Sequence, residues 1–161
     1  MVADRRASFD GWLGPYKVEK IARAEGILVG VSGPGALLGR VREILGNKTL
    51  PVDTAGAIGQ LVNLQREREG KEPACLLVVT RGALLEIDPS GGCFHLEQDV
   101  WAIGNGSMTA MGWLKGYAHA RSRRLDSIEP ALGEEAIRYV STVQTSVGDG
   151  CQAEWLVRED E

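Results

Sequence analysis

The sequence is poor in the residues that build disulfide frameworks and metal sites. It has three cysteines, Cys75, Cys93 and Cys151, far apart and without CxxC spacing, and two histidines, His95 and His119. An odd cysteine count without a pairing pattern favours reduced thiols and a cytoplasmic setting. Neither histidine has a histidine, cysteine or acidic partner at ligand spacing on one helix face, so we expect no metal and no other cofactor.

Long apolar runs and an excess of positive charge are also missing. We find no run of about 18 apolar residues that would span a membrane, and no leader typical of a signal peptide. The net charge is −4, so the chain as a whole has no positive charge that would attract nucleic acid. One basic cluster, Arg121, Arg123 and Arg124 beside His119, is interpreted as a solvated helix end. We therefore expect neither a nucleic-acid nor a membrane partner.

The pattern that remains is that of one globular domain over residues 1–161, with 43% hydrophobic residues. Apolar spacing and turn residues predict the elements as follows. Strands are expected at 16–23, 27–31, 74–80, 83–87, 93–96, 100–103 and 152–157, and helices at 36–45, 54–69, 108–121 and 130–145. Ser107 is a candidate N-cap for the third helix, and Cys75 and Cys93 are expected in the core. This order favours antiparallel strands with helices on both outer faces.

Two other patterns suggest alternative functions. Gly33-x-Gly35-x-x-x-Gly39 follows a strand and opens a helix, as in a Rossmann-type phosphate loop. That fold should place an acidic residue at the end of the next strand, whereas here a second helix follows, so a plain turn and helix is favoured. A serine-hydrolase interpretation is disfavoured because the candidate serines have no histidine near them in sequence. These serines are Ser8, Ser32 and Ser107.

Five features in order resemble segments of proteasome β-subunits and of the bacterial HslV peptidase. Residues 3–8, ADRRAS, resemble the ADxRAT segment, and Lys20 matches the family's catalytic lysine at the HslV spacing. Residues 30–33, GVSG, resemble the GxxG strand end, residues 102–107, AIGNGS, resemble AIGSGG, and residues 147–151, VGDGC, resemble AGDIC. The resemblance covers essentially the whole chain. It implies an α+β fold, the four-layer αββα sandwich of N-terminal-nucleophile hydrolases.

The resemblance also implies a mechanism, that of a threonine-type peptidase. In the family an N-terminal threonine uses its own α-amine as the base, whose reference pKa lies near 8. Asp4 would orient Lys20, Lys20 would lower the pKa of the nucleophile, and the Gly33 amide would bind the oxyanion. We expect Lys20 to lie within about 4 Å of an Asp4 oxygen. An ordinary surface ion pair is the alternative interpretation of these two residues.

The sequence departs from the family's pattern at several of the implied catalytic positions. Asn105 replaces a serine that supports the amine in the family, and Thr145 stands where proteasomes carry an aspartate. Two further implied site residues lie within the matched segments, Ser107 in the AIGSGG-like one and Asp149 in the AGDIC-like one. As written, the chain opens at Met1 roughly where the family's first strand should end, without the terminal threonine. The expectation is a threonine-type peptidase subunit that lacks its nucleophile in this form. The alternative is a non-catalytic ring or scaffold protein with the same fold.

The resemblance implies partners as well. Proteasome-type subunits work as stacked rings, so we expect a homo-oligomer, with a ring as the expected form. Apolar helix residues such as Leu114, interpreted as more than one core face needs, support that expectation. Unfolded peptide is the implied substrate, and an ATP-dependent unfoldase is an implied partner.

Overall fold

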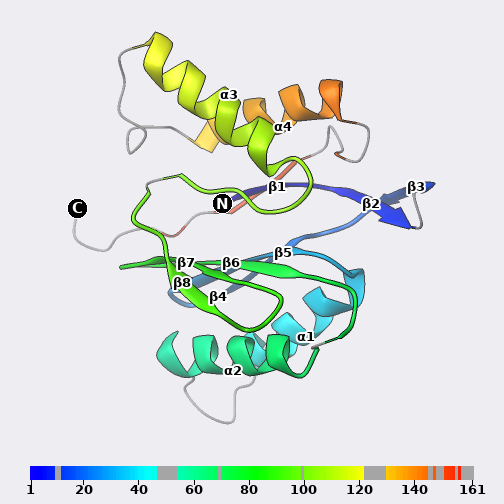
Figure 1. The fold of residues 1–161 in the computed structure, drawn as a ribbon, viewed down its shortest axis with the longest axis vertical. Coiled ribbons are helices and arrows are strands. Elements are labelled where there is room, and N and C mark those ends of the chain that lie inside the picture. Colours follow the sequence, from blue (N-terminus) through cyan, green and yellow to red (C-terminus); the bar gives the residue numbers. More distant parts are fainter. Residues whose placement is uncertain are drawn as a thin grey trace. The chain divides into compact units, whose positions relative to one another are not determined.

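The computed structural model describes residues 1–9, 12–46, 54–68, 70–98, 100–121, 130–144, 147, 151–154 and 156. These residues group into two compact units (Figure 1). One unit comprises residues 1–20 and 98–153, and the other residues 21–97 and 154–161. Within the described ranges, no helix is both long and apolar enough to cross a membrane.

The second unit is built on a five-stranded sheet in the order β4-β5-β6-β7-β8. Its strands are β4 (Ile21–Ala24), β5 (Ile27–Ser32), β6 (Cys75–Thr80), β7 (Leu84–Ile87) and β8 (Cys93–His95). Every neighbouring pair is antiparallel. A Rossmann-type nucleotide fold needs a parallel sheet, so the glycine-rich segment after β5 is not a dinucleotide loop.

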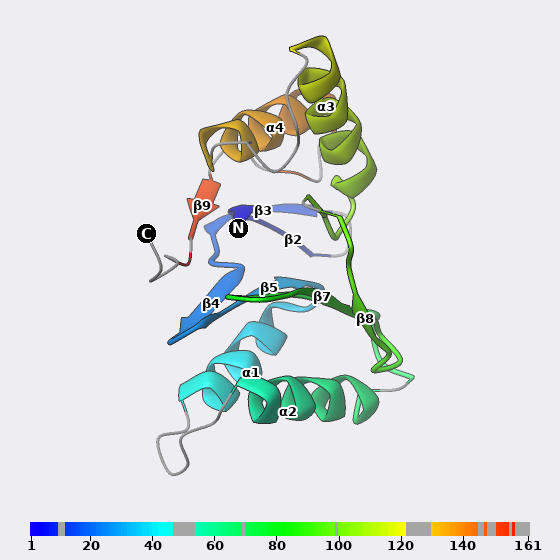
Figure 2. The ribbon, with the colours of Figure 1, turned by 90° about the vertical axis from the view of Figure 1, so that its left-hand side faces the viewer.

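Two helices, α1 (Gly35–Gly46) and α2 (Thr54–Arg66), cover one face of this sheet (Figures 1 and 2). Leu37, Leu38 and Val41 of α1 have helical spacing and are buried, as is Leu61 of α2. They pack against the side chains of β5 and β6 that face the helices, which include Val29, Leu76 and Val78. Burial of these apolar groups is the main source of stability in this unit.

The turn that follows β7 is organised by one carboxylate. Asp88 Oδ1 accepts hydrogen bonds from Ser90 N at 2.8 Å, Ser90 Oγ at 2.7 Å and Gly92 N at 2.8 Å. These bonds, the Ser90 hydroxyl first among them, lower the pKa of Asp88 below its ordinary value. The ionised carboxylate therefore fixes the turn that returns the chain into β8.

Replacing Asp88 with alanine is expected to lower the free energy of unfolding by about 1 kcal/mol at neutral pH. The folded pKa lies below the unfolded one, so this contribution is fully present above the unfolded pKa. It is lost as the pH falls through the folded pKa. Urea unfolding of the wild type and Asp88→Ala should therefore differ at neutral pH and converge in acid. The exposed Glu97 lies outside this turn and provides the control, because Glu97→Ala should change the free energy of unfolding by less than about 0.5 kcal/mol.

The described residues of the first unit form two pairs of strands and two helices. β1 (Val2–Asp4) pairs antiparallel with β9 (Cys151–Ala153), and β2 (Arg6–Phe9) forms a hairpin with β3 (Trp12–Lys17). Helices α3 (Ser107–Ala120) and α4 (Pro130–Val143) pack on each other, and α4 also packs on β1 and β9. Their buried contacts form two clusters, one of Leu114, Leu132 and Ala136 and one of Ala110, Val140 and Val147.

Several predicted local features differ from the structure. Residues 16–23 do not form one strand, because residues 18–20 separate β3 from β4. Residues 100–103 are not a strand, since Val100 and Ala102 pack instead against the clusters between α3 and α4. The N-cap of α3 is Gly106, with no side-chain capping bond, and Ser107 is the first helical residue.

Two burial predictions were also wrong. Cys93 is exposed because it lies on β8, a short edge strand whose three residues are all exposed. Leu114 is buried between α3 and α4, so it offers no support for contacts between subunits.

Candidate functional site

The β2–β3 hairpin brings Lys20 back to Asp4. Arg6 pairs with Lys17, and Val18 N donates a hydrogen bond to Arg5 O at 2.9 Å. This register closes the gap of 16 residues between Asp4, at the end of β1, and Lys20. The predicted contact between the two side chains is therefore confirmed, and its cause is the hairpin.

Lys20 Nζ donates to both carboxylate oxygens of Asp4, at 3.1 Å to Oδ1 and 2.9 Å to Oδ2. The Lys20 side chain is 27% exposed and that of Asp4 is 15% exposed. A pair so far removed from solvent is held more firmly than the exposed ion pairs of a protein surface. The arrangement fixes an ammonium group on a side chain that is mostly buried.

The backbone of Lys20 is held by a residue that sequence reasoning missed. Gln152 Oε1 accepts a hydrogen bond from Lys20 N at 2.9 Å, and Gln152 is only 7% exposed. Gln152 pairs with Ala3 in the β1–β9 ladder, next to Asp4. The one available signal was a polar residue inside a predicted strand, immediately after the AGDIC-like segment.

Asn105 and Ser107 flank the start of α3. Asn105 is exposed in the turn that begins at Gly104, whose φ is +91°, and Ser107 N donates to Gly104 O at 3.0 Å. Gly106 between them lies tightly on the helix pair, since a Cβ there would come within 2.8 Å of Val140. The turn is thus firmly placed, and a role for Asn105 and Ser107 beside Lys20 stays a prediction.

The structure does not test the other three implied catalytic positions. Gly33 follows β5 in the second unit, with φ +142°, and its distance from Lys20 stays a prediction. Thr145 and Asp149 lie outside the described residues. The structure therefore brings together Asp4 and Lys20 and adds Gln152.

The Cys75 thiol is a poor substitute for the missing nucleophile. Burial, followed by the negative charges of Glu86 and Asp88, raises the pKa of the Cys75 thiol. A raised pKa leaves less of the reactive thiolate at neutral pH. Among the described residues, no group of three or more histidine, cysteine or acidic side chains could hold a metal ion.

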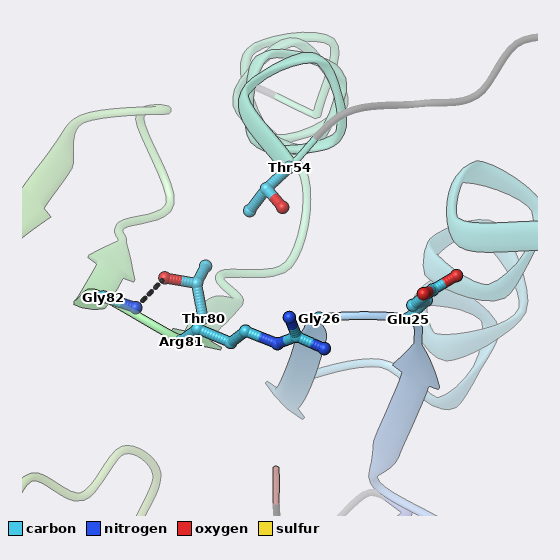
Figure 3. A pocket seen from close by; sticks show the side chains of 6 residues that line it. All are labelled: Glu25, Gly26, Thr54, Thr80, Arg81 and Gly82. Carbon is cyan, nitrogen blue, oxygen red and sulfur yellow. Dashed lines mark hydrogen bonds between the residues drawn. The ribbon is translucent and has the colours of Figure 1, made fainter. Parts of the chain in front are cut away.

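A separate pocket of about 360 Å³ lies in the second unit, where the turns after β4 and β6 meet the start of α2 (Figure 3). Glu25 and Arg81 bring opposite charges to it, and Thr80 Oγ1 accepts a bond from Gly82 N at 3.3 Å. None of the predicted catalytic residues lines this pocket. Its lining comprises Glu25, Gly26, Thr54, Thr80, Arg81 and Gly82.

No protein-family model matches the sequence, and no curated protein matches it. Solved structures do match. HslV from Trypanosoma brucei has a TM-score of 0.68 at 19% identity, over 94% of this chain and 88% of that one. BPH from Thiobacillus denitrificans has a TM-score of 0.71 over the same shares, at 17% identity in its complex with epoxomicin and 15% in a second structure. The chain has the fold of these HslV and BPH structures, which confirms the predicted α+β fold class.

Proposed function

We propose that this chain, which has an HslV-type fold, is a subunit of a threonine-type peptidase. The observation that carries the proposal is the Lys20–Asp4 pair, held at 2.9 Å and largely withdrawn from solvent. The resemblance to proteasome β-subunits assigns these two residues to the groups that activate the nucleophile. In this proposal residues 1–161 act as one domain in the cytoplasm.

The proposed chemistry uses the ammonium of Lys20 beside an N-terminal threonine. The threonine hydroxyl gives its proton to the α-amine while its oxygen attacks the peptide carbonyl. The C–N bond then breaks, the proton passes to the leaving amine, and water hydrolyses the resulting ester. The positive charge of Lys20 stabilises the negative charge that develops on the threonine oxygen, and Asp4 keeps Lys20 oriented.

The test is a peptide-hydrolysis assay on two proteins. One is the chain as written, and the other, called the extended protein, carries a threonine-led β-strand in front of Met1 with the threonine as its free N-terminus. The extended protein should hydrolyse unfolded peptides and bind epoxomicin, the compound found with BPH. Sequencing the N-terminus of the protein isolated from its own cells would show which form occurs naturally. A folded, assembled extended protein without turnover would refute the peptidase proposal and favour the scaffold role.

We also propose that the subunit forms a ring-shaped homo-oligomer that receives unfolded peptide from an ATP-dependent unfoldase. Exposed apolar side chains on α3 and α4 support the oligomer, namely Met108 at 83%, Tyr139 at 45% and Val143 at 54% exposed. Tyr139 also lies 6.4 Å from Trp113 between ring centroids, which extends an aromatic group over both helices. Such a surface is typical of contacts between subunits.

The double variant Tyr139→Lys/Val143→Lys is expected to shift the oligomer to smaller species, because two ammonium groups would have to lose water at the interface. Light scattering at micromolar concentration measures the change. Phe94→Lys, on the edge strand of the second unit, removes an equally exposed apolar side chain and should leave the assembly intact. A wild-type monomer at these concentrations would contradict the proposal.

A further inference from the structure

We infer that Gln152 is a positioning residue that fixes Lys20 for the proposed peptidase reaction, an inference that rests on the proposed function. Lys20 lies outside the β1–β9 ladder, yet the ladder holds it at two points. Its backbone N–H is bonded to Gln152 of β9, and its Nζ is bonded to Asp4 of β1. Two neighbouring strands thereby determine where the ammonium group lies.

The direction of the Gln152 side chain follows from the pleat of the ladder. Gly133 of α4 lies so close to Val2 that a Cβ there would come within 2.8 Å of Val2 Cγ2. The Cys151 Sγ lies 3.9 Å from Glu134 O, also in α4. Successive residues of a strand point to opposite faces, so Gln152 lies on the face away from α4. The hydrogen bond that Gln152 Oε1 accepts from Lys20 N shows that the glutamine is directed toward the segment that carries Lys20.

Among the described residues, Gln152 Oε1 is the one acceptor of a hydrogen bond from the Lys20 backbone N–H. A methionine at position 152 would keep the length and most of the volume of glutamine but remove that acceptor. The Lys20 backbone could then move toward water, and its Nζ would no longer be held over Asp4 by a fixed main chain. Small displacements of a catalytic group are costly, since a misplacement of about 1 Å can cost about 100-fold in rate.

The experiment compares Gln152→Met and Gln152→Glu in the extended protein. Gln152→Met should lower kcat by about 10- to 100-fold with KM unchanged, because orientation and not substrate binding is lost. Gln152→Glu retains an oxygen acceptor and should restore most of kcat. The NMR signals of the Lys20 amide and ammonium protons provide a second readout that needs no turnover. Gln152→Met should speed the exchange of both with water, and Gln152→Glu should reverse the effect.

Gln65→Met is the matched control. Gln65 is also a buried glutamine, 1% exposed, whose Nε2 donates to Ala74 O at 2.7 Å in the second unit. It should lose stability while kcat and the Lys20 signals stay unchanged.

The outcomes separate the two proposals. Altered Lys20 signals with unchanged kcat would overturn the positioning role and leave the peptidase intact. Unaltered Lys20 signals in Gln152→Met would show that Gln152 does not hold Lys20 in place, which would overturn the positioning role. An extended protein without turnover refutes the proposed function itself, and with it the catalytic role of Gln152.

Discussion

Replacing Lys20 with alanine is expected to reduce peptide hydrolysis by the extended protein at least about 100-fold, the usual contribution of a positioned proton-transfer or charge-stabilising group. The reason is that the ammonium lies 2.9 Å from Asp4 and is the cation the nucleophile would meet. Initial rates with an unfolded peptide measure the effect. Lys115→Ala removes an exposed lysine from α3 and serves as the control that should keep full activity.

The effect on activity has to be separated from an effect on folding. Lys20→Ala removes both charge-assisted hydrogen bonds that the Asp4 carboxylate, 15% exposed, accepts from Lys20 Nζ, which costs about 1–3 kcal/mol. Circular dichroism and urea unfolding would show that the variant is still folded under assay conditions. A folded Lys20→Ala protein that keeps more than half of the wild-type rate would remove Lys20 from the mechanism.

Asp4 offers a further check on the same pair. If Asp4 acts only by orienting Lys20, Asp4→Ala combined with Lys20→Ala should lose no more activity than Lys20→Ala alone. Groups that act as one unit show such non-additive effects. Additive losses would mean that Asp4 has a separate role.

The contact between Asp4 and Lys20 could be predicted because it depends on a local feature. A hairpin between the two residues fixes their distance through its register, Arg6 opposite Lys17. The core of the second unit could also be predicted from the sequence, since the helical spacing of Leu37, Leu38 and Val41 matches their burial. In both cases, short-range sequence patterns decide the outcome.

Other features depend on residues that are distant in sequence, and sequence patterns did not reveal them. The bond from Lys20 to Gln152 joins residues 132 positions apart, and it requires β9 to pair with β1. The burial of Leu114 also depends on distant residues, because Leu132 and Ala136 of α4 pack against it. Residues 100–103 have the composition of a strand, but the side chains of Val100 and Ala102 pack against the clusters between α3 and α4. Tertiary packing overrides local propensity at these positions.

Gly33 has a proposed catalytic role and also a backbone conformation that only glycine adopts without strain. We therefore expect its replacement to lower the stability of the protein strongly. Its φ of +142° strains any residue with a Cβ, and a Cβ there would lie 2.6 Å from Ala74 Cβ and 3.0 Å from Ala74 Cα. Gly33→Ala is therefore expected to lower the free energy of unfolding by about 2–5 kcal/mol, from backbone strain and overpacking together. Urea unfolding measures the loss, whether or not the protein is active.

A double-mutant cycle divides that loss into its two causes. Ala74→Gly removes the methyl group that the new side chain meets, so the double variant should recover about 1–2 kcal/mol relative to the sum of the single changes. The remainder combines backbone strain, because φ at Gly33 is unchanged, with the close contacts of the new Cβ to Ala74 Cα and Pro73 O. Gly39→Ala is the control: Gly39 lies exposed in α1, where an added methyl group would meet nothing within 4 Å, and the change should stabilise the helix by about 0.5–1 kcal/mol. A Gly33→Ala protein as stable as the wild type would show that the chain leaves β5 by a different path, and the Gly33 amide would then lose its place in the proposed oxyanion site.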